Sequence, residues 1–171
     1  ESGAPQRAAR TLRDVLDLWR GPALADFSYE PFAQSEIARL EEARLAAIEE
    51  RIDADLATGE HTALVSELES LVREHPARER FQGQLMLSLY RSGRQGDALA
   101  SYRKARRSLG QELGLEPGRA LQELERAILA QDPALDPPSR RSGVAASRRR
   151  RGGLLIAAGG AVLAAVIALA A

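Results

Sequence analysis

The sequence predicts an all-α fold of about six helices arranged as consecutive hairpins, followed by a linker and one transmembrane helix. Apolar residues recur at spacings of three and four along most of the chain up to residue 131, a pattern typical of helices with one buried face. No segment shows the period-two alternation of apolar and polar residues that is typical of strands. The final segment, 152–171, carries no charged residue.

The first two helices are predicted at 5–19 and 31–58. Gly21-Pro22 ends the first, because a residue before proline disfavours the helical conformation, and Pro31 suits the first turn of the second. Gly59 is expected to cap the second helix in a left-handed conformation. The residues expected to face inward are Ala8, Leu12, Val15, Leu16 and Trp19 in the first helix, and Ile37, Leu40, Leu45, Ile48, Ile52 and Leu56 in the second.

Four shorter helices are predicted at 62–74, 77–92 and 95–109, and from Pro117 onward after a connector at 110–114. The helix at 77–92 is apolar on more than one side, so we expect it to lie between neighbours. Pro76 and Gly93 end the helices that precede them. The expected inward residues are Leu64, Leu68, Leu71 and Val72; Phe81, Leu85, Leu87, Leu89 and Tyr90; Ala98, Leu99, Tyr102, Ala105 and Leu109; and Leu121, Leu124 and Ile128.

A weak internal repeat indicates how these helices are arranged. Gly59 and Gly93 are 34 residues apart, and the same offset relates Leu64 to Ala98 and Leu68 to Tyr102. This is the period of tetratricopeptide-type hairpins, in which a small residue lets two helices approach closely. A generic helical bundle with glycine caps at chance positions is the alternative.

Composition limits the function classes. The chain has 171 residues and no cysteine, so disulfides, thiolate metal sites and thiol nucleophiles are excluded. It contains no glycine-rich phosphate loop and no nucleophile elbow. His61 and His75 are isolated and near predicted helix ends, where a solvent or capping role is common. We therefore expect no catalytic residue, no metal, no cofactor and no small-molecule substrate.

Charge divides the chain into two parts. The residues before Arg140 contain 24 acidic and 18 basic side chains, a net charge of −6, whereas six arginines lie within 140–151. A domain of net negative charge is poorly suited to binding DNA, because phosphate neutralisation needs a positive face. We therefore expect DNA contact only through a domain that this chain does not contain.

The C-terminal part predicts a membrane anchor. Residues 1–131 form the expected helical domain, 132–151 a disordered linker rich in Pro, Ser and Arg, and 152–171 a transmembrane helix. A helix of that length spans roughly 30 Å, the thickness of a bilayer's hydrocarbon core. The four arginines at 148–151 favour a cytoplasmic location for residues 1–151. A secretory signal and a buried soluble helix are the alternatives.

One local basic patch interrupts the acidic domain. Its functional interpretation is a docking surface for an acidic protein partner, or a supporting contact to a DNA backbone. The alternative is a solvated helix face whose charges pair with Glu49, Glu50 and Asp53 of the second helix. The candidate residues are Arg91, Arg94, Arg103, Lys104, Arg106 and Arg107.

Several longer motifs resemble one family. They are LWRGPALAD at 18–26, ARLEEARLAAIEERIDADLATGEH at 38–61, L-x-x-LVREHPARER at 68–80, LMLSLYRSGRQGDALASYRKARRSLGQELGLEPG at 85–118 and LQELERAIL at 121–129. Together they resemble the bacterial transcriptional activation domain of the antibiotic-regulatory-protein family of actinobacterial regulators. The resemblance implies a tetratricopeptide-like domain that follows a winged helix-turn-helix and helps it to dimerise and activate transcription.

The sequence therefore predicts the regulatory domain of a membrane-anchored transcriptional regulator, acting through a protein partner or self-association. The chain begins with Glu and ends inside an apolar run, so we expect a piece of a longer protein. The alternative function is a helical scaffold that binds a cytoplasmic protein at the membrane without regulating DNA.

Overall fold

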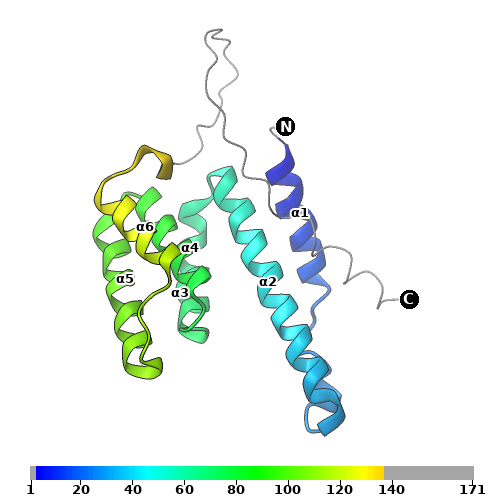
Figure 1. Cartoon of the computed structure of the whole chain (residues 1–171). Coiled ribbons are helices and arrows are strands. Elements are labelled where there is room, and N and C mark those ends of the chain that lie inside the picture. The colour runs from blue at the N-terminus through cyan, green and yellow to red at the C-terminus, as the bar shows by residue number, and fades with distance from the viewer. Residues whose placement is uncertain (1–2, 137–171) are drawn as a thin grey trace. The chain divides into compact units, whose positions relative to one another are not determined.

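The computed structural model describes residues 3–136, and within them the chain is all-helical, without strands (Figure 1). All six predicted helices are present in this part of the chain. Short 3-10 turns, η1 (Ala25–Phe27) and η2 (Pro31–Ala33), join the first two helices. The helices are α1 (Ala4–Asp17), α2 (Gln34–Thr58), α3 (His61–Glu74), α4 (Glu79–Arg91), α5 (Gln95–Ser108) and α6 (Arg119–Leu129).

The first hairpin, formed by α1 and α2, packs through small side chains. The two helices lie side by side (Figure 1). Ala9 of α1 and Ala33 before α2 are buried, and Ala23 in the connection donates its backbone N–H to the Glu41 carboxylate at 2.8 Å. Alanines at the contact allow close approach of the two backbones. Ala8 was predicted to face inward, but it is exposed and Ala9 takes its place.

The 34-residue repeat corresponds to a repeated cap. Gly59 ends α2 with φ +86°, and Gly93 follows α4 with φ +77°, conformations that favour glycine. The residue after each glycine donates its N–H to a carbonyl five positions back, Glu60 to Asp55 and Arg94 to Leu89. Both helices thus end in the same Schellman-type turn.

Helix α4 is central, as its sequence predicts. It contacts α2, α3, α5 and α6. Its residues Phe81 and Met86 have no exposed surface, and Leu85 and Leu89 are also buried. The rest of this core comes from the neighbouring helices and consists of Ile52, Leu56, Leu64, Val65, Leu68, Ala98, Tyr102, Ala105, Leu121 and Ile128.

The segment before α6 differs from its prediction. The expected connector at 110–114 is largely a π-helical turn (Leu109–Leu113), and α6 begins at Arg119 rather than at Pro117. The cause is a contact between distant residues: the Gly118 N–H donates to Glu79 Oε2 at 2.7 Å. A Cβ on residue 118 would lie 3.0 Å from that oxygen, so a larger residue there would require the Glu79 side chain to shift.

Within residues 3–136, no helix is long and apolar enough to span a bilayer. The predicted transmembrane helix at 152–171 and most of the predicted linker lie outside the described residues.

Candidate functional site

The predicted basic patch is divided in the structure. Arg103, Lys104, Arg106 and Arg107 are exposed in the last turns of α5 and form one surface, here called the α5 basic face. Arg94 lies just before α5, where its Nε donates to Asp97 at 2.7 Å. Arg91 lies at the end of α4.

Arg91 serves the fold rather than a partner. Its Nε donates to the Leu135 carbonyl at 2.8 Å and its Nη1 to the Leu56 carbonyl at 3.0 Å. Burial lowers the pKa of Arg91, although Asp136 opposes this effect. Arg91 therefore fastens the segment that follows α6 to the end of α2.

The α5 basic face keeps most of its charge available. Arg106 pairs with Glu116 at 2.8 Å, and this hydrogen bond raises the pKa of Arg106. Arg103, Lys104 and Arg107 form no ion pair with any residue in 3–136. A hollow of about 410 Å³ opens between these side chains, lined by Arg103, Arg106, Arg107, Gly110, Gln111 and Glu116.

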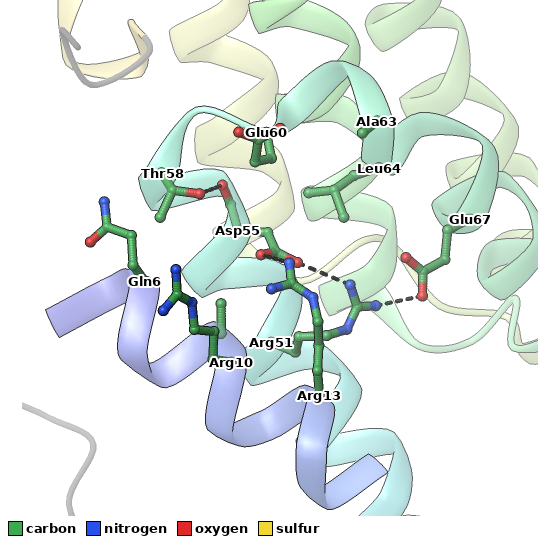
Figure 2. A pocket seen from close by; sticks show the side chains of 11 residues that line it. Gln6, Arg10, Arg13, Arg51, Asp55, Thr58, Glu60, Ala63, Leu64 and Glu67 are labelled. Carbon is green, nitrogen blue, oxygen red and sulfur yellow. Dashed lines mark hydrogen bonds and ion pairs between the residues drawn. The ribbon is translucent and has the colours of Figure 1, made fainter. Parts of the chain in front are cut away.

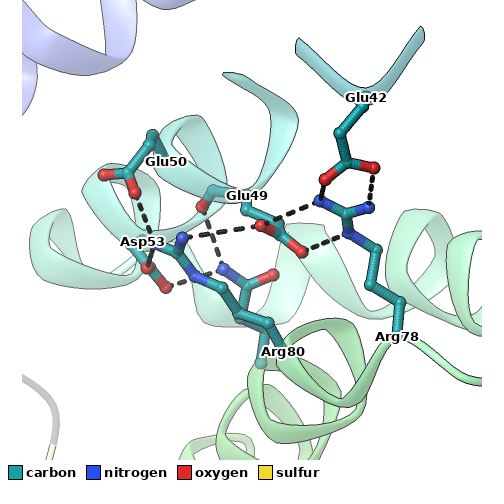
Figure 3. A network of polar contacts seen from close by, with 7 residues as sticks. Glu42, Glu49, Glu50, Asp53, Arg78 and Arg80 are labelled. Carbon is teal, nitrogen blue, oxygen red and sulfur yellow. Dashed lines mark hydrogen bonds and ion pairs between the residues drawn. The ribbon is translucent and has the colours of Figure 1, made fainter. Parts of the chain in front are cut away.

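The acidic residues of α2 pair with different arginines from those of the patch. Figure 3 shows two arginines that contact four carboxylates of α2: Arg78, just before α4, and Arg80, in its first turn. Arg78 binds Glu42 at 2.7 Å and Glu49 at 2.6 Å. The pairing of Glu49, Glu50 and Asp53 with the basic patch, our alternative expectation, is therefore wrong.

This network joins α4 to α2. Arg80 donates to Glu50 at 2.7 Å and to Asp53 at 2.6 Å, and Gln84 donates to the Glu49 carbonyl at 2.9 Å. Hydrogen bonds to Glu42 and Glu49 raise the pKa of Arg78. For Arg80, burial lowers the pKa, but the bonds to Asp53 and Glu50 outweigh it and the net shift is upward.

A groove that no sequence motif indicated lies between α1, α2 and α3 (Figure 2). Its volume is about 520 Å³. In its lining, the buried carboxylate of Asp55 accepts hydrogen bonds from Arg13 of α1 and from Arg51 of α2, and Arg51 also donates to Glu67 of α3. The α1–α3 groove is lined by Gln6, Ala9, Arg10, Arg13, Arg51, Asp55, Thr58, Glu60, Ala63, Leu64 and Glu67.

The two histidines lie at the ends of α3, as expected from their sequence positions. His61 is its first residue and His75 follows its last, with the His75 ring 6.1 Å from that of Phe81. Among residues 3–136, no group of three or more potential ligands is placed to hold a metal ion.

Comparison with known proteins agrees with the family resemblance of the motifs. Residues 1–129 match the family model described as the bacterial transcriptional activator domain. The regulatory protein DnrI of Streptomyces peucetius is 44% identical over 136 residues, which are 80% of this chain and 50% of the relative. The regulatory protein AfsR of Streptomyces coelicolor is 52% identical over 124 residues, which are 72% of this chain and 12% of the relative.

A solved structure supports the same assignment. Mycobacterium tuberculosis EmbR, determined in complex with a low-affinity phosphopeptide, has a TM-score of 0.75 and 38% sequence identity, covering 77% of this chain and 35% of EmbR. The chain thus spans half or less of the length of these three relatives. Since the family model matches most of its residues, the chain belongs to the bacterial transcriptional activator domain family.

Proposed function

We propose that this chain is the protein-interaction domain of a bacterial transcriptional regulator, and that the α5 basic face is its docking surface for an acidic partner. The observation that carries the proposal is the absence of ion pairs for Arg103, Lys104 and Arg107 within residues 3–136 of an otherwise acidic domain. Exposed arginines arranged around a hollow favour recognition of carboxylates, because guanidinium groups bind them in bidentate geometry.

The family supports a role in transcription. DnrI, AfsR and EmbR are all named as regulatory proteins. EmbR was solved in complex with a phosphopeptide, and this chain covers 35% of EmbR. In this proposal DNA is bound only by a winged-helix domain outside the chain, and the helical hairpins form a tetratricopeptide-like array that presents the α5 basic face.

A reporter assay tests the proposal. The chain is fused to a DNA-binding domain of unrelated origin in an actinobacterial host carrying the cognate reporter. We expect several-fold higher transcription than with the DNA-binding domain alone, and a return to that baseline with Arg103→Glu/Arg107→Glu, because the reversed charges repel an acidic partner.

The control is Arg7→Glu/Arg20→Glu, which makes the same change of charge at exposed residues near the two ends of α1. This variant should activate like the parent. Equal activation by parent and α5 variant would overturn the docking surface. No activation by a fusion that accumulates normally would overturn the role in transcription and favour the scaffold function.

We also propose that the domain is attached to a membrane, with 1–131 as the helical domain, 132–151 as the linker, 152–171 as a single membrane span and residues 1–151 in the cytoplasm. The support is the uncharged composition of 152–171 and the arginines at 148–151. Because the chain has no cysteine, Ser139→Cys provides a unique label site.

The membrane proposal predicts two results. The chain should remain with membranes after carbonate extraction, and Ser139→Cys should react with an impermeant maleimide only after the cells are permeabilised. Recovery in the soluble fraction would overturn the anchor, and labelling in intact cells would overturn the orientation.

A further inference from the structure

We propose that the α1–α3 groove is a second binding site, which takes an extended peptide segment that bears carboxylate side chains. The groove is built from helices other than α5, so it is separate from the α5 basic face. Its ligand therefore does not have to be the partner that the α5 basic face binds.

One wall of the groove is a row of donors on α1. Gln6, Arg10 and Arg13 are spaced by four and three residues, which places them on one helix face over about 10 Å. Figure 2 shows their side chains along the groove. Arg10 is exposed and has no ion pair within residues 3–136, and the side chain of Arg13 is 47% exposed although it binds Asp55.

A network of charges beside this row holds Arg13 in place. The Asp55 side chain is only 3% exposed and is bound by both Arg13 and Arg51, and Arg51 is in turn bound by Glu67. An arginine held in this way loses less conformational entropy when it binds a ligand than a freely rotating one. The network therefore pre-organises Arg13 toward a carboxylate.

The sign of the ligand follows from which charges are already paired. Three carboxylates line the groove: those of Asp55 and Glu67 are bound by arginines, and Glu60 is not without a partner either. Arg10 and the remaining N–H donors of Arg13, by contrast, face the groove. A guanidinium has five N–H donors and no acceptor, so the matching group is an anion, and a carboxylate fits it in bidentate geometry.

The remaining lining favours a peptide over a small organic molecule. Small-molecule pockets are lined mainly by hydrophobic and aromatic side chains, whereas six of the eleven residues here are charged and none is aromatic. The apolar lining consists of Ala9, Ala63 and Leu64, which leave room for a backbone. The Gln6 amide can both donate to and accept from that backbone.

Nuclear magnetic resonance of the ¹⁵N-labelled full chain tests the site. The probe is the tripeptide acetyl-Asp-Gly-Glu-amide, titrated to about 10 mM so that a Kd of about 1 mM would be nearly saturated. We expect chemical-shift changes at the amides of α1 and at Nε of Arg10 and Arg13. The uncharged peptide acetyl-Asn-Gly-Gln-amide should cause none.

Arg10→Gln is the decisive variant, because Arg10 has no ion pair within residues 3–136 whose loss would disturb the fold. We expect it to weaken binding about tenfold, in line with the loss of a hydrogen bond to a charged group. Arg7→Gln removes the same charge from α1 outside the groove and should bind like the parent.

The outcomes separate this proposal from the proposed function. Binding that persists in Arg103→Glu/Arg107→Glu but falls in Arg10→Gln supports the groove, whatever the reporter assay gives. Shift changes confined to α5, no changes at all, or equal affinities of Arg10→Gln and Arg7→Gln would overturn it.

Discussion

The two ends of α2 have different surroundings. Toward its C-terminus, Ile52 and Leu56 are buried against a core that α3 to α6 complete. Toward its N-terminus, the connection from α1 leaves large apolar side chains in solvent. Phe32 is 73% exposed and Tyr29 is 97% exposed.

This difference indicates that one helix serves two purposes. The C-terminal half of α2 belongs to the folded core, where each apolar side chain has several partners. The N-terminal half is held by alanine contacts and ion pairs, which fix its position but bury little apolar surface. We therefore expect substitutions in the core to affect stability strongly and substitutions near the α1–α2 connection to affect it weakly.

The largest difference in stability is expected between alanine variants of two phenylalanines. Phe81 is fully buried in α4, so Phe81→Ala should lower the free energy of unfolding by about 3–5 kcal/mol. Phe32→Ala should change it by no more than about 0.5 kcal/mol, because its side chain is mostly exposed. Urea denaturation followed by circular dichroism measures both. Similar losses for the two variants would show that the connection is part of the core.

Alanine substitutions at two glycines separate the effect of backbone strain on stability from the effect of packing. Gly93→Ala should cost about 1–2 kcal/mol, because its φ of +77° is unfavourable for a residue with a Cβ. Gly83→Ala should instead stabilise the domain by about 0.5–1 kcal/mol through helix propensity. Its Cβ would lie 3.7 Å from Leu121 and Leu124, an ordinary contact. Thermal melting of both variants compares the signs, and a destabilised Gly83→Ala would reveal overpacking between α4 and α6.

A smaller, pH-dependent effect on stability is expected from the ion pair between Arg78 and Glu42 of α2. The hydrogen bond from Arg78 lowers the pKa of Glu42 below 4.5. The ionised carboxylate therefore adds stability above about pH 4.5, and this contribution is lost as the pH falls through the lowered pKa. Glu42→Gln should be less stable than the parent at pH 7, and the difference should shrink below pH 4.5. A difference that does not change with pH would exclude this contact as its source.

The fold was largely predictable because helical spacing and glycine caps are local signals. Leu64 and Ala98 could be placed on equivalent helix faces from their positions relative to Gly59 and Gly93. The start of α6 could not, because it depends on Gly118 meeting Glu79, 39 residues away in the sequence. Contacts between distant residues leave no periodic pattern in the chain.

The sites were less predictable for the same reason. A cluster of basic residues near residue 103 is visible in the sequence, and the structure keeps its last four members together. The sequence does not show that Arg91 binds two backbone carbonyls instead of joining that surface. The α1–α3 groove is formed by residues from three helices, and Arg13 and Asp55 are 42 positions apart. The spacing of Gln6, Arg10 and Arg13 was the one available signal, and alone it indicates only a polar helix face.

Arg91 has a consequence for folding kinetics. Most helix contacts join neighbours in the chain, a low contact order that favours fast folding. The two carbonyls that Arg91 binds are 35 and 44 residues away on opposite sides of it, so both bonds require nearly the whole domain to be in place. We expect Arg91→Ala to leave the folding rate almost unchanged and to raise the unfolding rate, as seen in a chevron plot. The Arg91 side chain would then lengthen the lifetime of the folded domain without changing how fast the domain folds.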